Sequence, residues 1–298
     1  MIEAKHPSAL KLVLLFSFMV TVWSLSFVII KNAAEEVPPV LLSTLRAVGS
    51  ALVMIPVALW DARKHPHPRW QWEDAPKLLC AGALGITVNQ LFFVVGLNRT
   101  SVAHASIVMA LNPAFVYLLA MSMGLEQPAA RRFGGLGVAL AGVALLQLAK
   151  GQGSVATPFG DLLVFIGSSA FGGYTVLGKS LTRRYGSIYV TAISFVVGAL
   201  LLVPIAWFSG QRMEPSQISA AAWLSIAYLV VMHSVICYMI FYYLLIHISA
   251  SRVSLFSYIQ PVLASLFAWM ILSETITPPV VGGGLLVTAG VWLAERRT

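Results

Sequence analysis

The sequence contains very little charge. Only 10% of its 298 residues are Asp, Glu, Lys or Arg, whereas 58% are hydrophobic and the mean hydropathy is +0.85. Soluble domains carry about 25% charged residues, so this chain lacks the polar surface that contact with water requires. The shortage of charge excludes an ordinary soluble protein and indicates a chain whose solvent is lipid.

Acidic residues and cysteines are also scarce. The chain has 11 Asp and Glu residues, and its two cysteines lie far apart without His or Cys at ligand spacing. We therefore expect no metal site and no cofactor. The net charge of +8 does not indicate a nucleic-acid partner, because the basic residues form short clusters between apolar runs instead of covering one face.

Ten apolar runs are long enough to span a bilayer as helices, each of which requires about 20 residues. The runs lie near residues 9–30, 38–60, 75–97, 101–124, 130–149, 158–178, 187–209, 221–246, 250–272 and 279–294. They are continuously apolar, whereas the strands of a membrane barrel alternate in polarity. The sequence predicts an all-α integral membrane protein with ten transmembrane helices.

The distribution of Lys and Arg predicts the orientation. With the N-terminus in the cytoplasm, 14 of these residues lie inside and 4 outside, and Arg46 lies within a span. Cytoplasmic loops carry the excess of positive charge in membrane proteins. We therefore expect a multi-pass protein of the plasma (inner) membrane with both termini in the cytoplasm.

The two halves of the chain repeat each other. An offset of 148 residues aligns Lys31 with Lys179, Pro113 with Pro261, Glu126 with Glu274, and Gly142 with Gly290. Each half, residues 1–150 and 151–298, contains five spans, and this odd number makes the second half enter the membrane from the opposite side. The predicted fold is two inverted five-helix repeats, which transporters use to open alternately to either side.

Polar residues in the middle of the spans are the candidate site, because polar groups in hydrocarbon are costly. Asn112 beside Pro113 and Gln260 beside Pro261 occupy equivalent positions, and each proline predicts a helix kink. These two amides could line a central cavity or only join neighbouring helices.

Other spans supply the remaining candidates for a substrate pathway: Trp23, Ser26, Arg46, Asn89, Gln90, Tyr174, His233 and Tyr238. Arg46 could pair with a substrate carboxylate or extend to the outer interface. His233 could carry protons or be an ordinary core residue, and the aromatic rings could enclose a substrate or only pack. Because no Asp or Glu lies near the middle of a span, facilitated transport or exchange is favoured, and proton coupling stays open.

Several of these motifs resemble a known family. The stretch from Ala103 to Pro113, followed by Glu126, resembles the EamA-type repeat, and a second copy runs from Ser251 to Glu274. The whole chain thus resembles the drug/metabolite transporter superfamily in its ten-helix EamA branch. The resemblance implies export or exchange of small metabolites, often amino acids, by alternating access.

We therefore expect a transporter of small metabolites, with amino acids or related compounds as the first substrates to test, and not an enzyme. The alternatives are a flippase for a lipid-linked substrate and a non-transporting membrane scaffold or sensor. The expected partners are a small-molecule substrate and the lipid bilayer. Glycines in the fifth and tenth spans could also form a homodimer or pack within the bundle.

Overall fold

A computed structural model describes residues 7–64, 71–122, 129–148, 157–248, 253 and 256–295. Seven helical passes in this part are long and apolar enough to cross a membrane. Four are single helices: α1 (Ala9–Glu36), α2 (Pro39–Lys64), α8 (Pro158–Tyr185) and α9 (Ser187–Phe208). Three further helices, α7 (Ala130–Leu148), α13 (Phe256–Leu272) and α14 (Pro278–Glu295), bring the passes to ten.

The third, fourth and eighth passes are each divided into shorter elements. The third contains η1 (Trp72–Asp74), α3 (Ala75–Gly82), η2 (Ala83–Val88) and α4 (Asn89–Leu97), and the fourth contains α5 (Val102–Met109) and α6 (Asn112–Ser122). The eighth follows the short turn η3 (Pro215–Gln217) and contains α10 (Ala220–Tyr228), η4 (Leu229–Ile236) and α11 (Cys237–His247). Both η2 and η4 are π-helical, and the offset of the sequence repeat places them at equivalent positions.

Hydroxyl side chains begin several of these helices. The side-chain oxygens of Ser8, Ser101, Thr157 and Ser219 each accept a hydrogen bond from the backbone N–H three residues later. Such a cap satisfies one of the free N–H groups at a helix start. In lipid this matters more than in water, because no solvent is present to satisfy the backbone.

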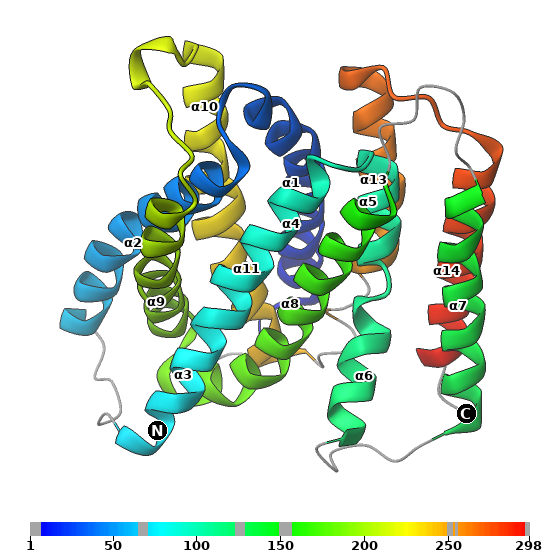
Figure 1. Ribbon diagram of the computed structural model, residues 1–298. Coiled ribbons are helices and arrows are strands. Elements are labelled where there is room, and N and C mark those ends of the chain that lie inside the picture. Colours follow the sequence, from blue (N-terminus) through cyan, green and yellow to red (C-terminus); the bar gives the residue numbers. More distant parts are fainter. Residues whose placement is uncertain are drawn as a thin grey trace.

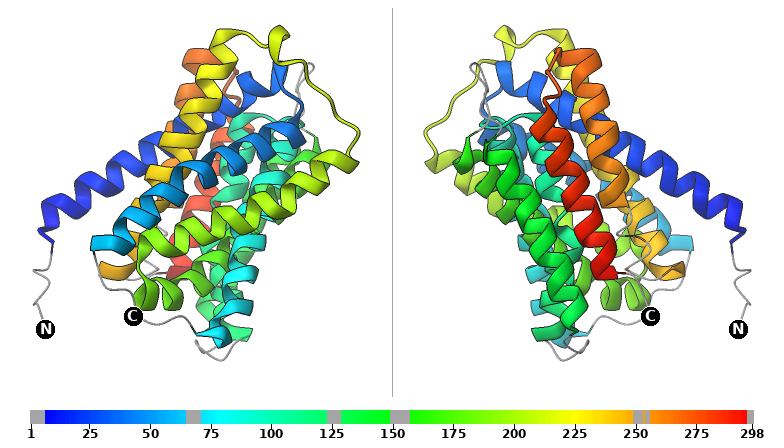
Figure 2. Two further views of the ribbon diagram at one scale, coloured as in Figure 1. Left: turned by 90° about the vertical axis from the view of Figure 1, so that its left-hand side faces the viewer. Right: turned by 90° about the vertical axis from the view of Figure 1, so that its right-hand side faces the viewer.

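The helices run alongside one another. The start of α1 and the end of α14 lie at the same end of the molecule (Figures 1 and 2). Contacts between the halves follow the inverted repeat. The repeat equivalents α2 and α9 pack together, as do α7 and α14. The packing of α1 against α13 is mirrored by that of α8 against α6. The fold is therefore an all-α membrane bundle of two inverted five-helix repeats, as the sequence predicts.

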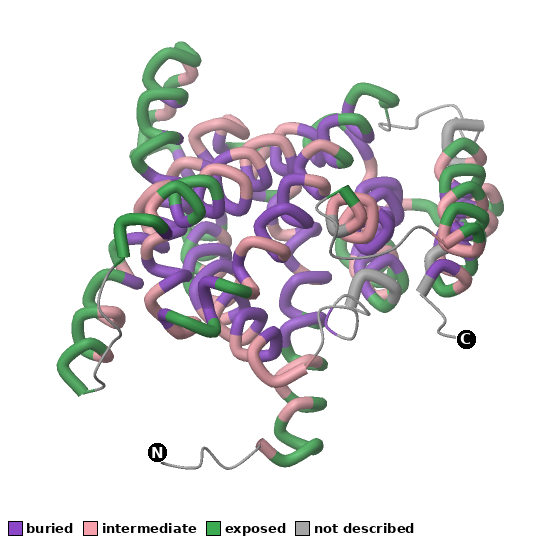
Figure 3. Tube along the Cα trace, turned by 90° about the horizontal axis from the view of Figure 1, so that it is seen from below, coloured by how far each residue is buried: buried purple, intermediate pink, exposed green. Residues whose placement is uncertain are grey.

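Burial is the reverse of that in a soluble protein. Large apolar side chains lie on the outside, among them Leu52, Leu200, Trp207 and Phe208, while Arg46, Gln90 and Gln260 are buried. Figure 3 shows the buried segments gathered in the centre of the bundle. Because lipid surrounds the outside, polar side chains in the spans are less costly when they face the interior.

Two local features concern the prolines and glycines that the sequence analysis singled out. The helical pass is interrupted between α5 and α6 just before Pro113, whereas α13 includes Pro261 within one helix; the kinks expected at both prolines stay predictions. Glycines of the fifth and tenth spans pack within the bundle: Gly142 lies against Val287, and Gly135 against Gly290. The predicted boundary between the halves, at residue 150, and Glu126 lie outside the described residues.

Candidate functional site

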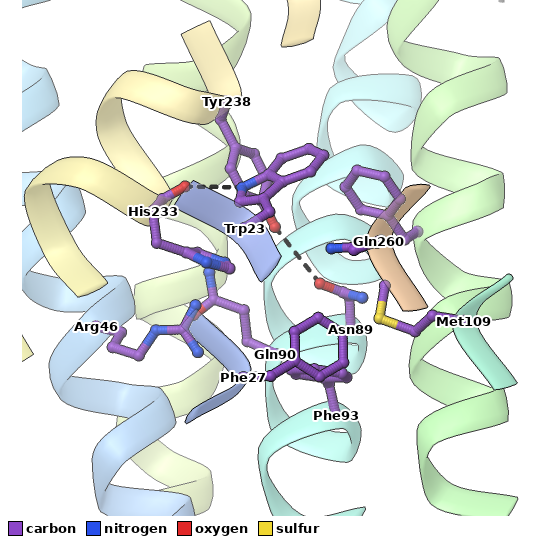
Figure 4. Close-up of a pocket in the computed structure, with 11 residues that line it drawn as sticks. Trp23, Phe27, Arg46, Asn89, Gln90, Phe93, Met109, His233, Tyr238 and Gln260 are labelled. Carbon is purple, nitrogen blue, oxygen red and sulfur yellow. Dashed lines mark hydrogen bonds between the residues drawn. The ribbon is translucent and has the colours of Figure 1, made fainter. Parts of the chain in front are cut away.

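A small cavity lies between the two halves, near the middle of the bundle (Figure 4). Its volume is about 40 Å³, enough for a few water molecules, so a metabolite would require side chains or helices to move apart. The lining residues come from both repeats: Trp23, Phe27, Arg46, Asn89, Gln90, Phe93, Met109, Phe171, His233, Tyr238 and Gln260.

Arg46 supplies the one permanently charged side chain among these lining residues. It projects from α2, is 1% exposed and is the largest fully buried side chain of the described chain. Neither Nε nor Nη1 has a hydrogen-bond partner among the described residues. The side chain therefore does not extend to the outer interface, which was one of the two interpretations of its sequence position. Its guanidinium is directed into the site instead.

Both members of the adjacent amide pair reach the cavity. Nδ2 of Asn89 donates to the carbonyl of Gly167 at 2.9 Å, and Oδ1 accepts from the hydroxyl of Tyr238 at 3.4 Å. Gln90 is 2% exposed, and neither polar atom of its amide has a hydrogen-bond partner in the described part of the chain. The same holds for Oε1 of Gln260, which comes from the other repeat. Unpaired buried amides of this kind are suited to hydrogen-bond a ligand.

The paired π-helices orient two aromatic side chains of the cavity. Trp23 Nε1 donates to the carbonyl of His233 in η4 at 3.1 Å, and Tyr238 donates to the carbonyl of Gly85 in η2 at 3.4 Å. Gly85 and His233 are equivalent positions of the repeat. A π-helix leaves carbonyls without their usual i+4 partner, and such segments occur often at functional sites. The first of these bonds is drawn in Figure 4.

Aromatic rings close the cavity on two sides. The ring of Trp23 lies 5.8 Å from that of Phe171 and 5.9 Å from that of Tyr238, with edge-to-face geometry in both pairs. One turn further along α1, Phe27 meets Phe93 at 5.0 Å, also edge to face. These separations are typical of favourable aromatic pairs, so the rings form fixed apolar walls.

Three of the predicted site residues do not line the cavity. Ser26 donates its hydroxyl to the carbonyl of Val22 at 2.7 Å, within its own helix. Tyr174 is fully buried, and its ring lies 5.0 Å from that of Tyr242. Asn112 donates to the carbonyl of Ser168 at 2.7 Å, and so joins α6 to α8.

The other seven predicted residues, Trp23, Arg46, Asn89, Gln90, His233, Tyr238 and Gln260, lie together around the cavity. Sequence reasoning did not select Phe27, Phe93 or Met109. The two phenylalanines each follow a selected residue by four positions, Trp23 and Asn89 respectively, and so lie on the same helix face. That spacing could have identified them.

Polar contacts fasten the helices near the end at which α1 finishes. Lys31 Nζ lies 2.8 Å from Oε1 of Glu274, whose carboxylate also accepts from the backbone N–H of Val102 at the start of α5. Asp161 of α8 accepts from the hydroxyl of Thr100 at 2.5 Å and contacts Nδ1 of His104 at 3.2 Å. These contacts hold α1, α5, α8 and the α13–α14 connection together beyond the cavity.

The bundle, its inverted halves and the central polar cavity define a multi-pass helical membrane protein with a site between two repeats. The model of the EamA-like transporter family matches residues 10–148 and again 158–295. The chain therefore belongs to the EamA-like transporter family, and it is a membrane transporter.

Several relatives are similar over most of the chain. An uncharacterized transporter of Archaeoglobus fulgidus is 28% identical over 95% of this chain and 97% of its own length. The uncharacterized inner membrane transporter YedA of Escherichia coli (strain K12) is 23% identical over 91% of this chain and 89% of its own. A solved crystal structure, 20% identical, matches 97% of each chain with a TM-score of 0.69, which shows the same fold.

Proposed function

We propose that the protein moves a small metabolite, an amino acid or a related compound, across the inner membrane by alternating access, and that it catalyses no chemical reaction. The supporting observation is the central cavity, in which buried polar atoms of Arg46, Gln90 and Gln260 have no partner among the described residues. Polar groups without partners in a membrane interior are costly, and a bound substrate would satisfy them.

The inverted repeat supports the mechanism. Two similar units of opposite orientation can exchange conformations, so that one site is reached first from one side and then from the other. The common position of the start of α1 and the end of α14 supports the proposed placement of both termini on one side, the cytoplasm (Figure 2).

Counterflow in proteoliposomes tests the proposal. The purified full-length protein is reconstituted into vesicles loaded with mixed unlabelled amino acids and organic acids, and the uptake of each labelled compound is measured. We expect accumulation of a subset of compounds above that in protein-free vesicles. Gln90→Ala should raise the KM for that subset, because the amide lines the cavity.

A matched amide substitution provides the control. Gln217→Ala alters an exposed residue of η3 whose side chain donates to Glu214, and it should leave the KM unchanged. If folded protein accumulates none of the compounds, small water-soluble metabolites are the wrong class. A lipid-linked substrate would then be the next to test, by measuring its movement between the leaflets of the same vesicles.

A further inference from the structure

We propose that the site binds its substrate as a monovalent organic anion, with the guanidinium of Arg46 as its counter-charge. This inference rests on the proposed function and narrows its substrate class. Within the range of amino acids and related compounds, it favours those with a free carboxylate and no ammonium group, such as 2-hydroxy acids.

The charges around the cavity carry the argument. Arg46 contributes +1, and none of the residues that line the cavity is acidic. The two buried carboxylates of the described chain and the half-buried Glu274 have partners elsewhere: Asp161 with Thr100, Asp74 with Arg184, and Glu274 with Lys31. The charge of Arg46 is therefore not balanced by a described acidic residue.

The net charge of the substrate then decides how well it fits. A charge removed from water without a counter-charge is strongly disfavoured. A monoanion would balance Arg46, whereas a zwitterion would leave one positive charge over and an amine would add a second. Figure 4 shows Arg46 and His233 on one side of the cavity.

The uncharged lining residues indicate which groups the ligand carries beside its carboxylate. The unpaired amide of Gln90 and Oε1 of Gln260 can bond a hydroxyl or another neutral polar group beside the carboxylate. The rings of Trp23, Phe27 and Phe93 form apolar walls suited to a hydrocarbon body. The combination fits a short carboxylic acid with one hydroxyl and an apolar tail.

The repeat shows that the charge is not required by the fold. The position equivalent to Arg46 is Ser194, which is buried and donates its hydroxyl to the carbonyl of Val190 at 2.7 Å. A small, buried residue therefore occupies the equivalent position in the other half, in the helix α9 that packs against α2. The guanidinium is an addition in one repeat, which supports a role in recognising a ligand.

A comparison of head groups tests the inference. Three side chains (methyl, isobutyl and benzyl) are each presented as the 2-hydroxy acid, the 2-amino acid and the primary amine, which gives a panel of matched probes. Each probe is measured by counterflow in proteoliposomes and by the shift in Tm of the detergent-purified protein. For at least one side chain, we expect the hydroxy acid to have a KM about tenfold or more below that of the amino acid.

Substitutions then connect the preference to one side chain. Arg46→Gln should abolish the preference for the hydroxy acid, Arg46→Lys should retain part of it, and Arg212→Gln, the same change in the loop between α9 and α10, should retain it fully. Since the wild-type comparison needs no variant, misfolding of Arg46→Gln would not prevent the test. Better transport of the amino acids would overturn the inference and leave the transporter proposal standing. Transport of none of the probes would overturn the inference and count against the proposed function.

Discussion

Asn112 and Gln260 occupy equivalent positions in the two repeats, yet their surroundings differ. Nδ2 of Asn112 donates to the carbonyl of Ser168 at 2.7 Å and to its hydroxyl at 3.3 Å. Gln260 lines the cavity, and its Oε1 has no partner in the described part of the chain. We predict that Asn112→Ala destabilises the protein with little effect on substrate affinity, and that Gln260→Ala has the opposite pattern.

The expected magnitude follows from the bonds that each change removes. Interhelical side-chain hydrogen bonds in membrane proteins contribute about 0.6 to 1.7 kcal/mol. Asn112→Ala removes one short and one longer bond, so we expect a loss of about 1–2 kcal/mol. At about 2–4 °C per kcal/mol for larger domains, Tm should fall by roughly 2–8 °C. Gln260→Ala removes a ligand contact of about 0.5–1.5 kcal/mol, which is roughly a 2- to 12-fold increase in KM.

Two assays on the same preparations separate these effects. Tm is followed in detergent by tryptophan fluorescence, and KM is measured by counterflow with the best substrate of the panel described above. Ser168→Ala serves as a control: it removes only the longer bond to Asn112 and should lower Tm by less than Asn112→Ala does. An unchanged Tm with a raised KM for Asn112→Ala would refute the assignment of this residue to helix packing.

Two further predictions concern the bundle around the site. Glu274→Gln removes both the ion pair with Lys31 and the charged acceptor of the α5 N-terminus, so hydrogen exchange in the first turn of α5 should become faster by roughly tenfold or more. Lys31→Met should cause a smaller increase, and equal increases would contradict this division of roles. A Cβ atom on Gly290 would collide with the backbone of α7, so Gly290→Ala should cost about 1–3 kcal/mol of stability in thermal unfolding. Gly137→Ala adds a methyl group in open space and replaces glycine by a better helix former, so it should not lower stability; similar losses at both sites would contradict the collision with α7 as the cause.

Much of the fold could be predicted because the bilayer imposes simple rules on the sequence. Hydrocarbon requires long apolar helices, so the ten spans are visible as runs, and the aligned prolines and glycines reveal the repeat. The structure extends some helices past the apolar runs: α8 continues to Tyr185, beyond the predicted end near residue 178. Polar residues at a helix end remain helical because the backbone hydrogen bonds continue into the interface, which a hydropathy pattern does not show.

The lining of the cavity was predictable mainly where it is polar. Arg46, Asn89 and Gln90 stand out in apolar spans, since hydrocarbon disfavours them unless they face the interior. Apolar lining residues such as Phe27 give no such signal, because the lipid-facing residues of the same helix are equally apolar. The π-helical segments were also not predictable, since they depend on how η2 and η4 pack against neighbours and not on a residue motif.

The sequence also could not show that Asn112 and Gln260 have different surroundings. Two aligned amides satisfy the repeat pattern equally well, but only a three-dimensional neighbour decides whether each finds a partner. Ser168, which binds Asn112, aligns with Val20 of the first repeat, and Val20 offers no hydroxyl. Gln260 thus has no serine at the equivalent position to accept from its amide nitrogen, and it lines the cavity, where its Oε1 has no partner among the described residues.

Arg46 and Gln260 line the cavity and differ from their repeat equivalents Ser194 and Asn112, and the proposed mechanism gives a physical reason for such a difference. Alternating access needs two halves that can exchange conformations, so the framework has to be similar in both, and the paired π-helices meet that need. A substrate has no such symmetry. If both repeats carried an arginine at the position of Arg46, a monoanion would leave one charge unbalanced, and if both carried serine, no counter-charge would exist. Placing Arg46 in one repeat and Ser194 in the other gives a single charge within a two-fold framework, which is the arrangement that recognition of one carboxylate requires.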